Sequence, residues 1–257
     1  MEEYILSVVL REMPSDFHSE ALKAQAVVAR TYTMRQMIKG GKHKNADVCT
    51  ESACCQGYWA VDSFLASGGT QGQIDKIKAA VDLTAGQILL YAGEPIDATY
   101  FSCSGGSTED AVAVWGTDVP YLRATLSPGE ESAKYHTDTV RFSVQEFAQK
   151  IGVQLKKSKS FKIGKITYTS GDGVDTIEIC GKVFRGTTIR KRLGLRSTAF
   201  VISVTGDHVV VTTKGYGHRV GMSQYGADAM AESGKNYEVI LLHYYAGVDL
   251  SSLDELY

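Results

Sequence analysis

Residues 3–13, EYILSVVLREM, predict a helix whose last turn carries one acid, Glu12. At about 100° per residue, four apolar or aromatic side chains lie within about 80° of Glu12: Tyr4, Ile5, Val8 and Val9. Glu12 therefore projects from the apolar side of the helix. Pro14 disfavours helical backbone at the residue before it, so the helix should end near Met13.

Both features of this position should raise the pKa of Glu12. Burial disfavours the charged form, and the carbonyl end of a helix disfavours a negative charge. A free Glu titrates near ~4.3, whereas a general acid needs a pKa of about 6–7. The alternative is a structural acid paired with Arg11, Lys23 or Arg30, because paired buried acids outnumber catalytic ones.

The next segment, residues 19–41, predicts a long helix that begins at Ser19 and is closed by Gly40 and Gly41. Several small alanine side chains suit it to close packing. Lys23 and Arg30 are seven residues apart and share one face. These two cations could orient a substrate, or could extend into solvent.

A cluster of His43, Cys49, Cys54 and Cys55 follows. Imidazole and thiolate ligands at short spacing indicate a tetrahedral zinc site, although the spacing matches no common zinc finger. Disulfides are the alternative, but Cys54 and Cys55 are adjacent and awkward to bridge to each other. Four protein ligands leave no open position, so a zinc ion here would be structural.

Further along, residues 70–84 predict a helix and residues 87–93 a strand. A strand at 95–103 leads into Ser104-Gly105-Gly106-Ser107, where Cys103 is expected to be a packed thiol. Residues 129–200 predict an inserted or second lobe. It includes a capped helix from Ser143, a hairpin around Gly171-Asp172-Gly173 and a strand cysteine, Cys180, expected in the core.

Residues 201–213 predict another hairpin, which leads into a glycine-rich loop with Tyr216, His218, Gln224 and Tyr225 ahead of a helix that begins near Ser223. Flat rings and amides suit a sugar site, and a plain helix-entry loop is the alternative. Strands that lie between helices without regular alternation indicate an α+β fold. We expect a helical N-terminal catalytic segment packed on antiparallel hairpins, with the smaller α+β lobe inserted.

Composition excludes some classes of protein. The 257 residues carry a net charge of −2, with no basic or acidic block, so nothing supports nucleic-acid binding. No stretch approaches the ~18 apolar residues of a membrane span, and Met1-Glu2-Glu3 does not resemble the start of a signal peptide. With 44% hydrophobic residues the chain reads as globular.

Four stretches resemble the stage II sporulation protein D family, which includes amidase-enhancer proteins of bacterial walls. They are EEYILSVVLREMPSDFHSEALKAQAVVARTYT (2–33), YFSCSGGSTEDAVAVWGTDVPYLRATLSP (100–128), FRGTTIRKRLGLRSTAF (184–200) and GYGHRVGMSQYGADAMAESGKNYEVILLHYYAG (215–247). The resemblance covers most of the chain in order. It implies a peptidoglycan lytic transglycosylase in which Glu12, directly before Met-Pro, is the catalytic acid.

Ordinary glycosidases need two carboxylates. The resemblance implies a single acid, which protonates the bond between N-acetylmuramic acid and N-acetylglucosamine and then helps to close a 1,6-anhydro ring. Candidates for binding the glycan are Lys23, Arg30, Tyr100, Ser104, Gly105, His218, Ser223, Gln224 and Tyr225. Some relatives bind zinc through two His and two Cys, and here Cys54 stands where a His is usual. Arg219 stands where many relatives have glycine. We expect no organic cofactor.

The resemblance also implies a place in endospore engulfment, between the mother-cell and forespore membranes. The expected partners are peptide-stripped glycan strands, a sporulation amidase and a membrane scaffold protein. Family members usually have an N-terminal membrane anchor before the equivalent of Tyr4, so we expect this chain to be a shortened form of an anchored protein. Residues 1–128 and 201–257 would form the catalytic core around the glycan cleft, with 129–200 as the further lobe.

Two other functions remain open. A non-catalytic amidase enhancer would bind the wall without cleaving it, and Glu12 would then be irrelevant to bond cleavage. A zinc amidase or peptidase using the His43 cluster would lose activity on chelation, but a site with four protein ligands is usually closed.

Overall fold

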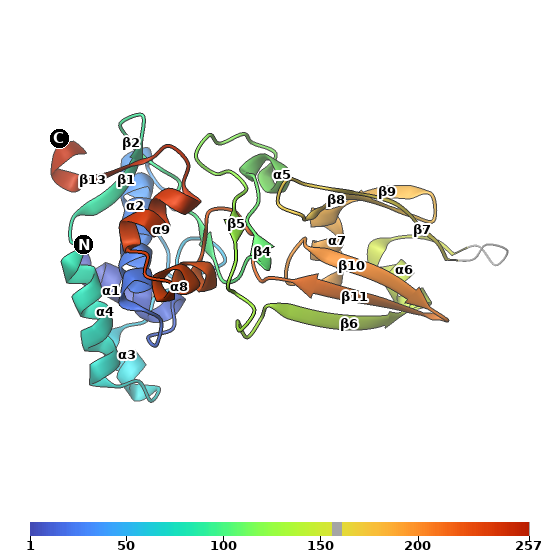
Figure 1. The fold of residues 1–257 in the computed structure, drawn as a ribbon, viewed down its shortest axis with the longest axis horizontal. Coiled ribbons are helices and arrows are strands. Elements are labelled where there is room, and N and C mark those ends of the chain that lie inside the picture. Colours follow the sequence, from blue (N-terminus) through green and yellow to red (C-terminus); the bar gives the residue numbers. More distant parts are fainter. Residues whose placement is uncertain (156–160, 257) are drawn as a thin grey trace. The chain divides into compact units, whose positions relative to one another are not determined.

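The computed structural model describes residues 1–155 and 161–256. The chain packs as two compact units (Figure 1). The first unit contains Met1–Tyr100 and Ala227–Tyr257, and the second contains Phe101–Gly226. Each unit combines helices with antiparallel strands, which confirms the α+β class. Residues 129–200 all lie within the second unit, and their separation from a glycan-cleft core remains a prediction.

The first unit is mainly helical. Its elements are α1 (Glu2–Glu12), α2 (Ser19–Lys39), α3 (Val61–Ala66), α4 (Gln71–Leu83), β1 (Gln87–Tyr91), β2 (Glu94–Pro95), α9 (Tyr237–Tyr244), β13 (Asp249–Ser252) and the 3-10 helix η1 (Leu253–Leu256). Helix α8 (Gln224–Glu232) begins in the second unit, and β3 (Tyr100–Phe101) spans the boundary. No described helix has both the length and the hydropathy to cross a membrane.

Local sequence sets the ends of the two leading helices as predicted. α1 ends at Glu12, and Met13 before the proline has extended backbone. α2 begins at Ser19, but its N-terminal cap is His18, whose ring nitrogen Nδ1 accepts a hydrogen bond from the Glu20 N–H. Gly40 ends α2 in a left-handed conformation, with φ of 80°.

Helix α2 is the centre of the first unit, and α1, α4, α9 and β1 all pack against it. Its alanines are fully buried, which lets neighbouring backbones approach closely: Ala21, Ala24, Ala26 and Ala29. The Thr31 hydroxyl on α2 accepts a hydrogen bond of 2.9 Å from the Leu89 N–H on β1. β1 lies between β2 and β13, antiparallel to both, so the end of the chain completes a sheet that the first hundred residues begin.

The strand predicted at 95–103 is wrong in extent. β2 ends at Pro95, and only Tyr100 and Phe101 return to strand geometry. Proline has no N–H to continue a ladder. Between the two strands, Ala98 and Thr99 donate hydrogen bonds to the carbonyls two residues before them, which turns the backbone.

The second unit contains most of the strands. Its elements are β4 (Gly106–Ser107), α5 (Ala111–Trp115), β5 (Leu126–Ser127), β6 (Thr137–Ser143), α6 (Val144–Ile151), β7 (Ile163–Tyr168), β8 (Val174–Ile179), β9 (Lys182–Arg185), α7 (Gly186–Leu193), β10 (Phe200–Thr205), β11 (His208–Lys214) and β12 (Met222–Ser223). Two antiparallel sheets have the orders β10-β11-β6 and β7-β8-β9.

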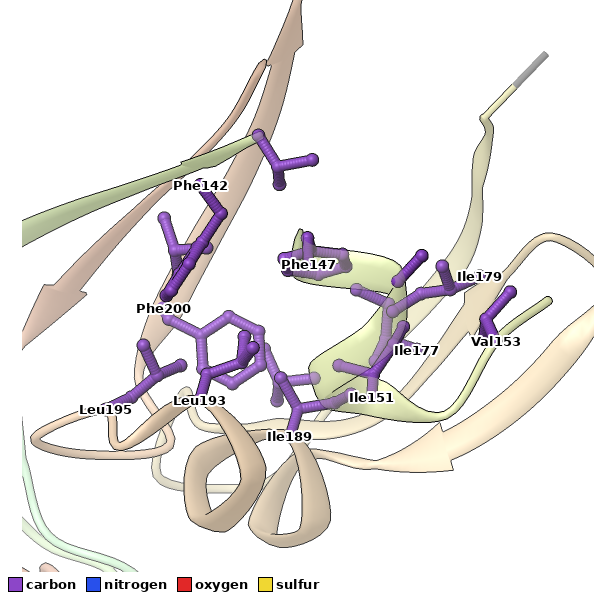
Figure 2. Close-up of a cluster of buried hydrophobic side chains, with 14 residues drawn as sticks. Phe142, Phe147, Ile151, Val153, Ile177, Ile179, Ile189, Leu193, Leu195 and Phe200 are labelled. Atoms are coloured by element: carbon purple, nitrogen blue, oxygen red, sulfur yellow. The ribbon is translucent and has the colours of Figure 1, made fainter. Parts of the chain in front are cut away.

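Helices α6 and α7 pack on each other and on strands of these sheets. Figure 2 shows the resulting core, in which Phe147 and Ile151 of α6 meet Ile189 of α7 and Ile177 of β8. All four side chains are fully buried. Burial of a side chain of this size contributes about 1.5–3 kcal/mol. The second unit therefore has a hydrophobic core of its own.

The predicted hairpins around Gly171-Asp172-Gly173 and at 201–213 are confirmed by β7–β8 and β10–β11. The prediction for Cys180 is wrong, because this residue is exposed in the turn between β8 and β9 with φ of 51°. The alternation that suggested a buried strand position ends one residue earlier, at Ile179.

Candidate active site

Glu12 lies half-buried at the end of α1 and is held from two sides. The Gly57 N–H donates a hydrogen bond to its Oε1, and the Tyr100 hydroxyl also bonds to the carboxylate. The same hydroxyl lies 3.5 Å from Oε1 of Gln56, whose amide nitrogen donates to the Thr33 hydroxyl on α2 at 2.9 Å. The acid is therefore fixed by residues from three separate segments of the first unit.

Gly57 allows this approach because it has no side chain. A Cβ at this position would lie 2.6 Å from Cγ of Arg11 and 2.7 Å from Oε1 of Glu12. Carbon atoms do not approach other heavy atoms so closely, so any other residue here would displace the carboxylate or the loop. The guanidinium of Arg11 is directed away over the ring of Trp59, 5.5 Å from its centroid.

Burial raises the pKa of Glu12, in the direction that the sequence predicted. The Gly57 N–H, the charge of Arg11 and the Tyr100 hydroxyl oppose this rise in part. Burial also raises the pKa of Tyr100 well above its ordinary value, and the nearby Glu12 charge adds to the rise. Tyr100 is therefore protonated near neutral pH and acts as a hydrogen-bond donor.

Arg30 lies apart from Glu12. Its guanidinium is fully buried and bonds to both carboxylate oxygens of Glu2 and to the Gln87 carbonyl at 3.0 Å. Glu2 and Glu12 are at opposite ends of α1, about 15 Å apart at 1.5 Å per residue. Lys23 is paired with Glu20 at 2.7 Å and lies over the ring of Tyr237.

The sequence-predicted metal ligands come together in the first unit. One ligand atom from each of His43, Cys49, Cys54 and Cys55 lies within 4.8 Å of the other three. His43 Nε2 is 3.3 Å from Sγ of Cys55 and 3.6 Å from Sγ of Cys54. Tetrahedral zinc, with bonds of about 2.3 Å to sulfur and 2.0–2.1 Å to nitrogen, gives nitrogen–sulfur separations of about 3.5 Å. The donor set and its spacing therefore fit zinc, and none of the five cysteines forms a disulfide.

The remaining predicted site residues lie in the second unit, where the loop of Ser104 and Gly105 surrounds a buried acid, Glu130. The Glu130 carboxylate accepts hydrogen bonds from the Ser104 N–H at 2.6 Å, the Ser104 hydroxyl at 2.8 Å and the Gly105 N–H at 3.2 Å. The Cys103 thiol donates to it as well, at 3.0 Å. The Ser104 side chain is thus buried and bonded within the protein, and Cys103 is the packed thiol that we predicted.

Ser223, Gln224 and Tyr225 begin α8 as predicted. The Ser223 hydroxyl accepts from the Gly226 N–H at 3.2 Å, and the Tyr225 N–H donates to the Ser102 carbonyl at 3.0 Å. Ser223 and Gln224 are buried. His218 packs its ring against Phe101 and Trp115, with centroids 5.6 Å and 5.3 Å away, and its Nδ1 accepts from the Val220 N–H.

Arg219 holds this part of the second unit together. Its buried guanidinium pairs with Glu109 at 3.1 Å and donates to the carbonyls of Ser104, Ser107 and Gly171. It joins the loop after β3 to the β7–β8 turn. Arg219 has φ of 68°, a backbone conformation that favours glycine, so its guanidinium contacts must compensate for local strain.

Sequence reasoning missed Gln56, Gly57, Glu109 and Glu130. No periodicity marks any of them, because all four lie outside regular elements. The two acids stand in STED and SPGEES, segments that read as solvated turns. Gln56 and Gly57 directly follow the cysteine pair, and this closeness in sequence was the available signal that the predicted metal loop also contacts other residues.

The chain is similar to known sporulation proteins and to an amidase enhancer. A family model described as "Stage II sporulation protein" matches residues 1–91, which contain Glu12 and the His/Cys cluster. Stage II sporulation protein D of Bacillus amyloliquefaciens is 42% identical over 99% of this chain and 75% of its own length. The protein of the same name from Bacillus subtilis is 41% identical over the same shares. An amidase enhancer of Bacillus subtilis is 30% identical over 95% of this chain and 40% of its own length. The chain therefore belongs to the stage II sporulation protein D family, a family of sporulation proteins.

Proposed function

We propose that this chain is a lytic transglycosylase that cleaves the bond between N-acetylmuramic acid and N-acetylglucosamine in peptide-stripped glycan strands. One observation carries the proposal: Glu12 is half-buried, its pKa is raised, and the Gly57 N–H and the Tyr100 hydroxyl fix its carboxylate. A positioned carboxyl group with a raised pKa is what general acid catalysis requires. Membership of a sporulation family supplies the context of wall remodelling.

The proposed reaction needs no second carboxylate. The protonated carboxyl group of Glu12, whose Oε1 accepts the Gly57 N–H, supplies the proton. That proton passes to the glycosidic oxygen as the bond from C1 of the muramic residue to this oxygen breaks, and positive charge develops at C1. The new carboxylate then takes the proton of the C6 hydroxyl, and O6 bonds to C1. The products are a 1,6-anhydro end and a free hydroxyl, Glu12 is again protonated, and no water is consumed.

The remaining predicted residues take two kinds of role in this proposal. We propose that Lys23, Tyr100, Gly105, His218 and Tyr225 contact the glycan. The other four are buried in the structure, so they would support the residues that contact the glycan without contacting it themselves: Arg30, Ser104, Ser223 and Gln224. The Arg30 pair with Glu2 sets the angle of α1, and Ser104 orders its loop around Glu130.

We also propose that His43, Cys49, Cys54 and Cys55 hold a structural zinc ion. The bound ion would act as a cross-link between the segments at 43–49 and 54–55. Gln56 and Gly57 follow the last ligand directly and contact Tyr100 and Glu12. The ligands would thus order the loop that positions the acid, without taking part in proton transfer.

The proposed setting is the space between the mother-cell and forespore membranes during engulfment, with an N-terminal anchor in the intact protein. The proposed partners are a sporulation amidase, which would strip the stem peptides first, and a membrane scaffold protein. The names of the relatives support these proposals, since they are a sporulation protein and an amidase enhancer.

A second candidate is a non-catalytic wall-binding protein of the amidase-enhancer kind. The observation that favours it is the 30% identity to an amidase enhancer over 95% of this chain. Such a protein would bind glycan and position another enzyme. It would give Glu12 no chemical role.

Mass spectrometry of denuded glycan strands separates the two candidates. The strands are incubated with the unmodified chain, with Glu12→Gln, and with Glu3→Gln as a matched control, because Glu3 is an exposed acid on the same helix. We expect anhydro-muramic products from the chain and from Glu3→Gln, but none from Glu12→Gln. Binding without cleavage by all three proteins would favour the enhancer. Reducing ends without the anhydro ring would mean hydrolysis and would require a second carboxylate.

A further inference from the structure

Loops of the second unit present two neighbouring aromatic pairs that the proposed chemistry does not use. Trp115, at the end of α5, has 46% of its surface exposed and lies against His218. Tyr216 is 42% exposed and meets Tyr135 edge-on, with ring centroids 5.2 Å apart. Only Gly217 separates Tyr216 from His218, so the two pairs are adjacent along the loop after β11.

One arginine lies against the rings of both tyrosines. The guanidinium carbon of Arg196 is 4.4 Å from the ring centroid of Tyr135 and 5.4 Å from that of Tyr216. Its Nε pairs with the Asp138 carboxylate at 3.0 Å. Among the described residues neither Nη nitrogen has a hydrogen-bond acceptor, and the side chain is 30% exposed. The face of this guanidinium is therefore fixed by rings, while its outer edge remains available to a ligand.

Backbone hydrogen bonds hold these loops in one arrangement. The Gly217 N–H donates to the Arg196 carbonyl at 3.1 Å, and the Gly215 N–H donates to the His136 carbonyl at 2.8 Å. Tyr216 and Cys103 exchange a pair of backbone bonds. Gly217 has φ of 126°, and a Cβ there would lie 2.7 Å from Cβ of Phe101. The rings and the guanidinium are thus preorganised, which lowers the cost of binding.

The combination points to an anionic sugar. Aromatic rings cover the apolar faces of pyranoses, and a guanidinium pairs with a carboxylate through two parallel hydrogen bonds. Lys134 lies over Tyr135 at 5.4 Å, so two cations and one anion, Asp138, surround this ring. A net positive charge remains to meet an anion.

We propose that Trp115, Tyr135, Arg196 and Tyr216 form a saccharide site that selects carboxylated sugar residues through Arg196. In the glycan of the proposed function, on which the choice of ligand rests, this group is the lactyl carboxylate of N-acetylmuramic acid. This site binds the carboxylated sugar selectively, whereas the carboxyl group of Glu12 performs the proposed cleavage.

The chain offers a direct reporter, because Trp59 and Trp115 are its two tryptophans. A Trp59→Phe, Glu12→Gln chain leaves the indole of Trp115 as the fluorophore and leaves the glycan intact. It is titrated with a peptide-free tetrasaccharide of alternating N-acetylglucosamine and N-acetylmuramic acid, and with a tetrasaccharide of N-acetylglucosamine alone. We expect both to change the Trp115 emission saturably, with the muramic ligand bound at least about tenfold more tightly, as for a hydrogen bond between charged groups.

Variants in the same background test each part of the site. Arg196→Gln should reduce muramic binding to the level of the uncharged ligand and leave the uncharged ligand unaffected. Tyr216→Ala should weaken both ligands by a similar factor, roughly tenfold. Arg192→Gln is the matched control, because Arg192 also lies over a ring, that of Phe184, elsewhere in the same unit. It should change neither affinity, and near-ultraviolet circular dichroism should show that all variants fold.

Three results would overturn the site: no emission change with either ligand, equal loss of both ligands in Arg196→Gln, or tighter binding of an oligothymidine than of the muramic ligand. The last would assign the rings and the arginine to single-stranded nucleic acid, which also binds through stacking. The cleavage assay with Glu12 intact is scored separately. Anhydro products without a Trp115 response would refute the saccharide site and support the transglycosylase. A saturable Trp115 response without anhydro products would support the saccharide site and refute the transglycosylase.

Discussion

At the scale of single residues, Gly57 and Glu12 act as a pair, and a methyl group at Gly57 tests the pairing. Gly57→Ala places a carbon within 2.7 Å of the carboxylate oxygen and must displace it. A misplacement of about 1 Å can cost a hundredfold in rate, so we expect kcat to fall by about tenfold to a hundredfold. Gly72→Ala is the control, because a Cβ at Gly72 meets nothing within 4 Å. Equal activities of the two variants would contradict the role of Gly57.

Tyr100 sets the pH range of Glu12. The Tyr100 hydrogen bond lowers the pKa of Glu12 against the larger effect of burial, so its removal should raise that pKa further. In the proposed reaction cleavage starts from protonated Glu12, so its rate should decline as pH rises through this pKa. In Tyr100→Phe the decline of kcat should move to higher pH. Tyr168→Phe, an exposed tyrosine of the second unit, should leave the pH–rate profile unchanged.

The same carboxyl group makes stability depend on pH. The folded pKa of Glu12 lies above the unfolded value of about 4.3. Its contribution to folding is thus fully present below the unfolded pKa and is lost as pH rises through the folded one. Comparison of Tm for the chain and Glu12→Gln between pH 4 and 8 should show the chain losing stability relative to the variant. A constant difference in Tm would mean that burial does not perturb Glu12.

At the scale of elements, the order of the loop from His43 to Gly57 should depend on the proposed zinc ion. Removal of zinc by a chelator, or Cys55→Ser, takes away a cross-link whose binding energy is also folding energy. We expect Tm of the first unit to fall by about 10 °C and cleavage to fall with it. Cys180→Ser, at an exposed turn outside the cluster, is the control. Retention of both Tm and activity in metal-free protein would refute the structural zinc.

Arg219 and Glu109 should be strongly coupled in their contribution to the stability of the second unit. Arg219→Ala leaves a buried carboxylate without its cation, at an expected cost of about 3–5 kcal/mol in urea unfolding. Arg219→Ala with Glu109→Gln should cost less than the sum of the single changes, because the double variant buries no unpaired charge. Lys78→Ala, which breaks the exposed pair with Asp82, should cost less than about 1 kcal/mol. Additive losses would show that the pair is not coupled.

At the scale of the whole molecule, the sequence predicted what local rules determine. Pro14 ended the first helix, Gly40 the second, and the hairpin turns at Gly171 and Gly206 fell where glycine and aspartate stood. The approach of the His/Cys cluster was also predictable, because imidazole and thiol groups this close in sequence are residue types that bind metals. Each of these signals occupies a short stretch of the chain.

The sequence could not predict the tertiary contacts between side chains that are far apart in the chain. The helical pattern left open whether Arg30 orients a substrate or extends into solvent. In the structure it is buried, and a partner 28 residues earlier, Glu2, accepts its hydrogen bonds. Arg219 in the glycine-rich loop gave no sign that Glu109 and Gly171 would surround it. Long-range pairs such as these determine which polar residues of the candidate site face a ligand and which support the fold.

The antiparallel pairing of β1 with β13 has a consequence for synthesis. The ribosome releases Glu12, its supporting loop and β1 before the second unit. It releases α9 and β13, which cover α2 and complete the sheet, after the second unit. Domains tend to fold as units during translation. The second unit is a continuous segment, so it can fold before β13 of the first unit has been made. Glu12 is thus made before β13 but is fixed in place only after β13 has paired, so a chain that stops short of β13 lacks an ordered candidate site.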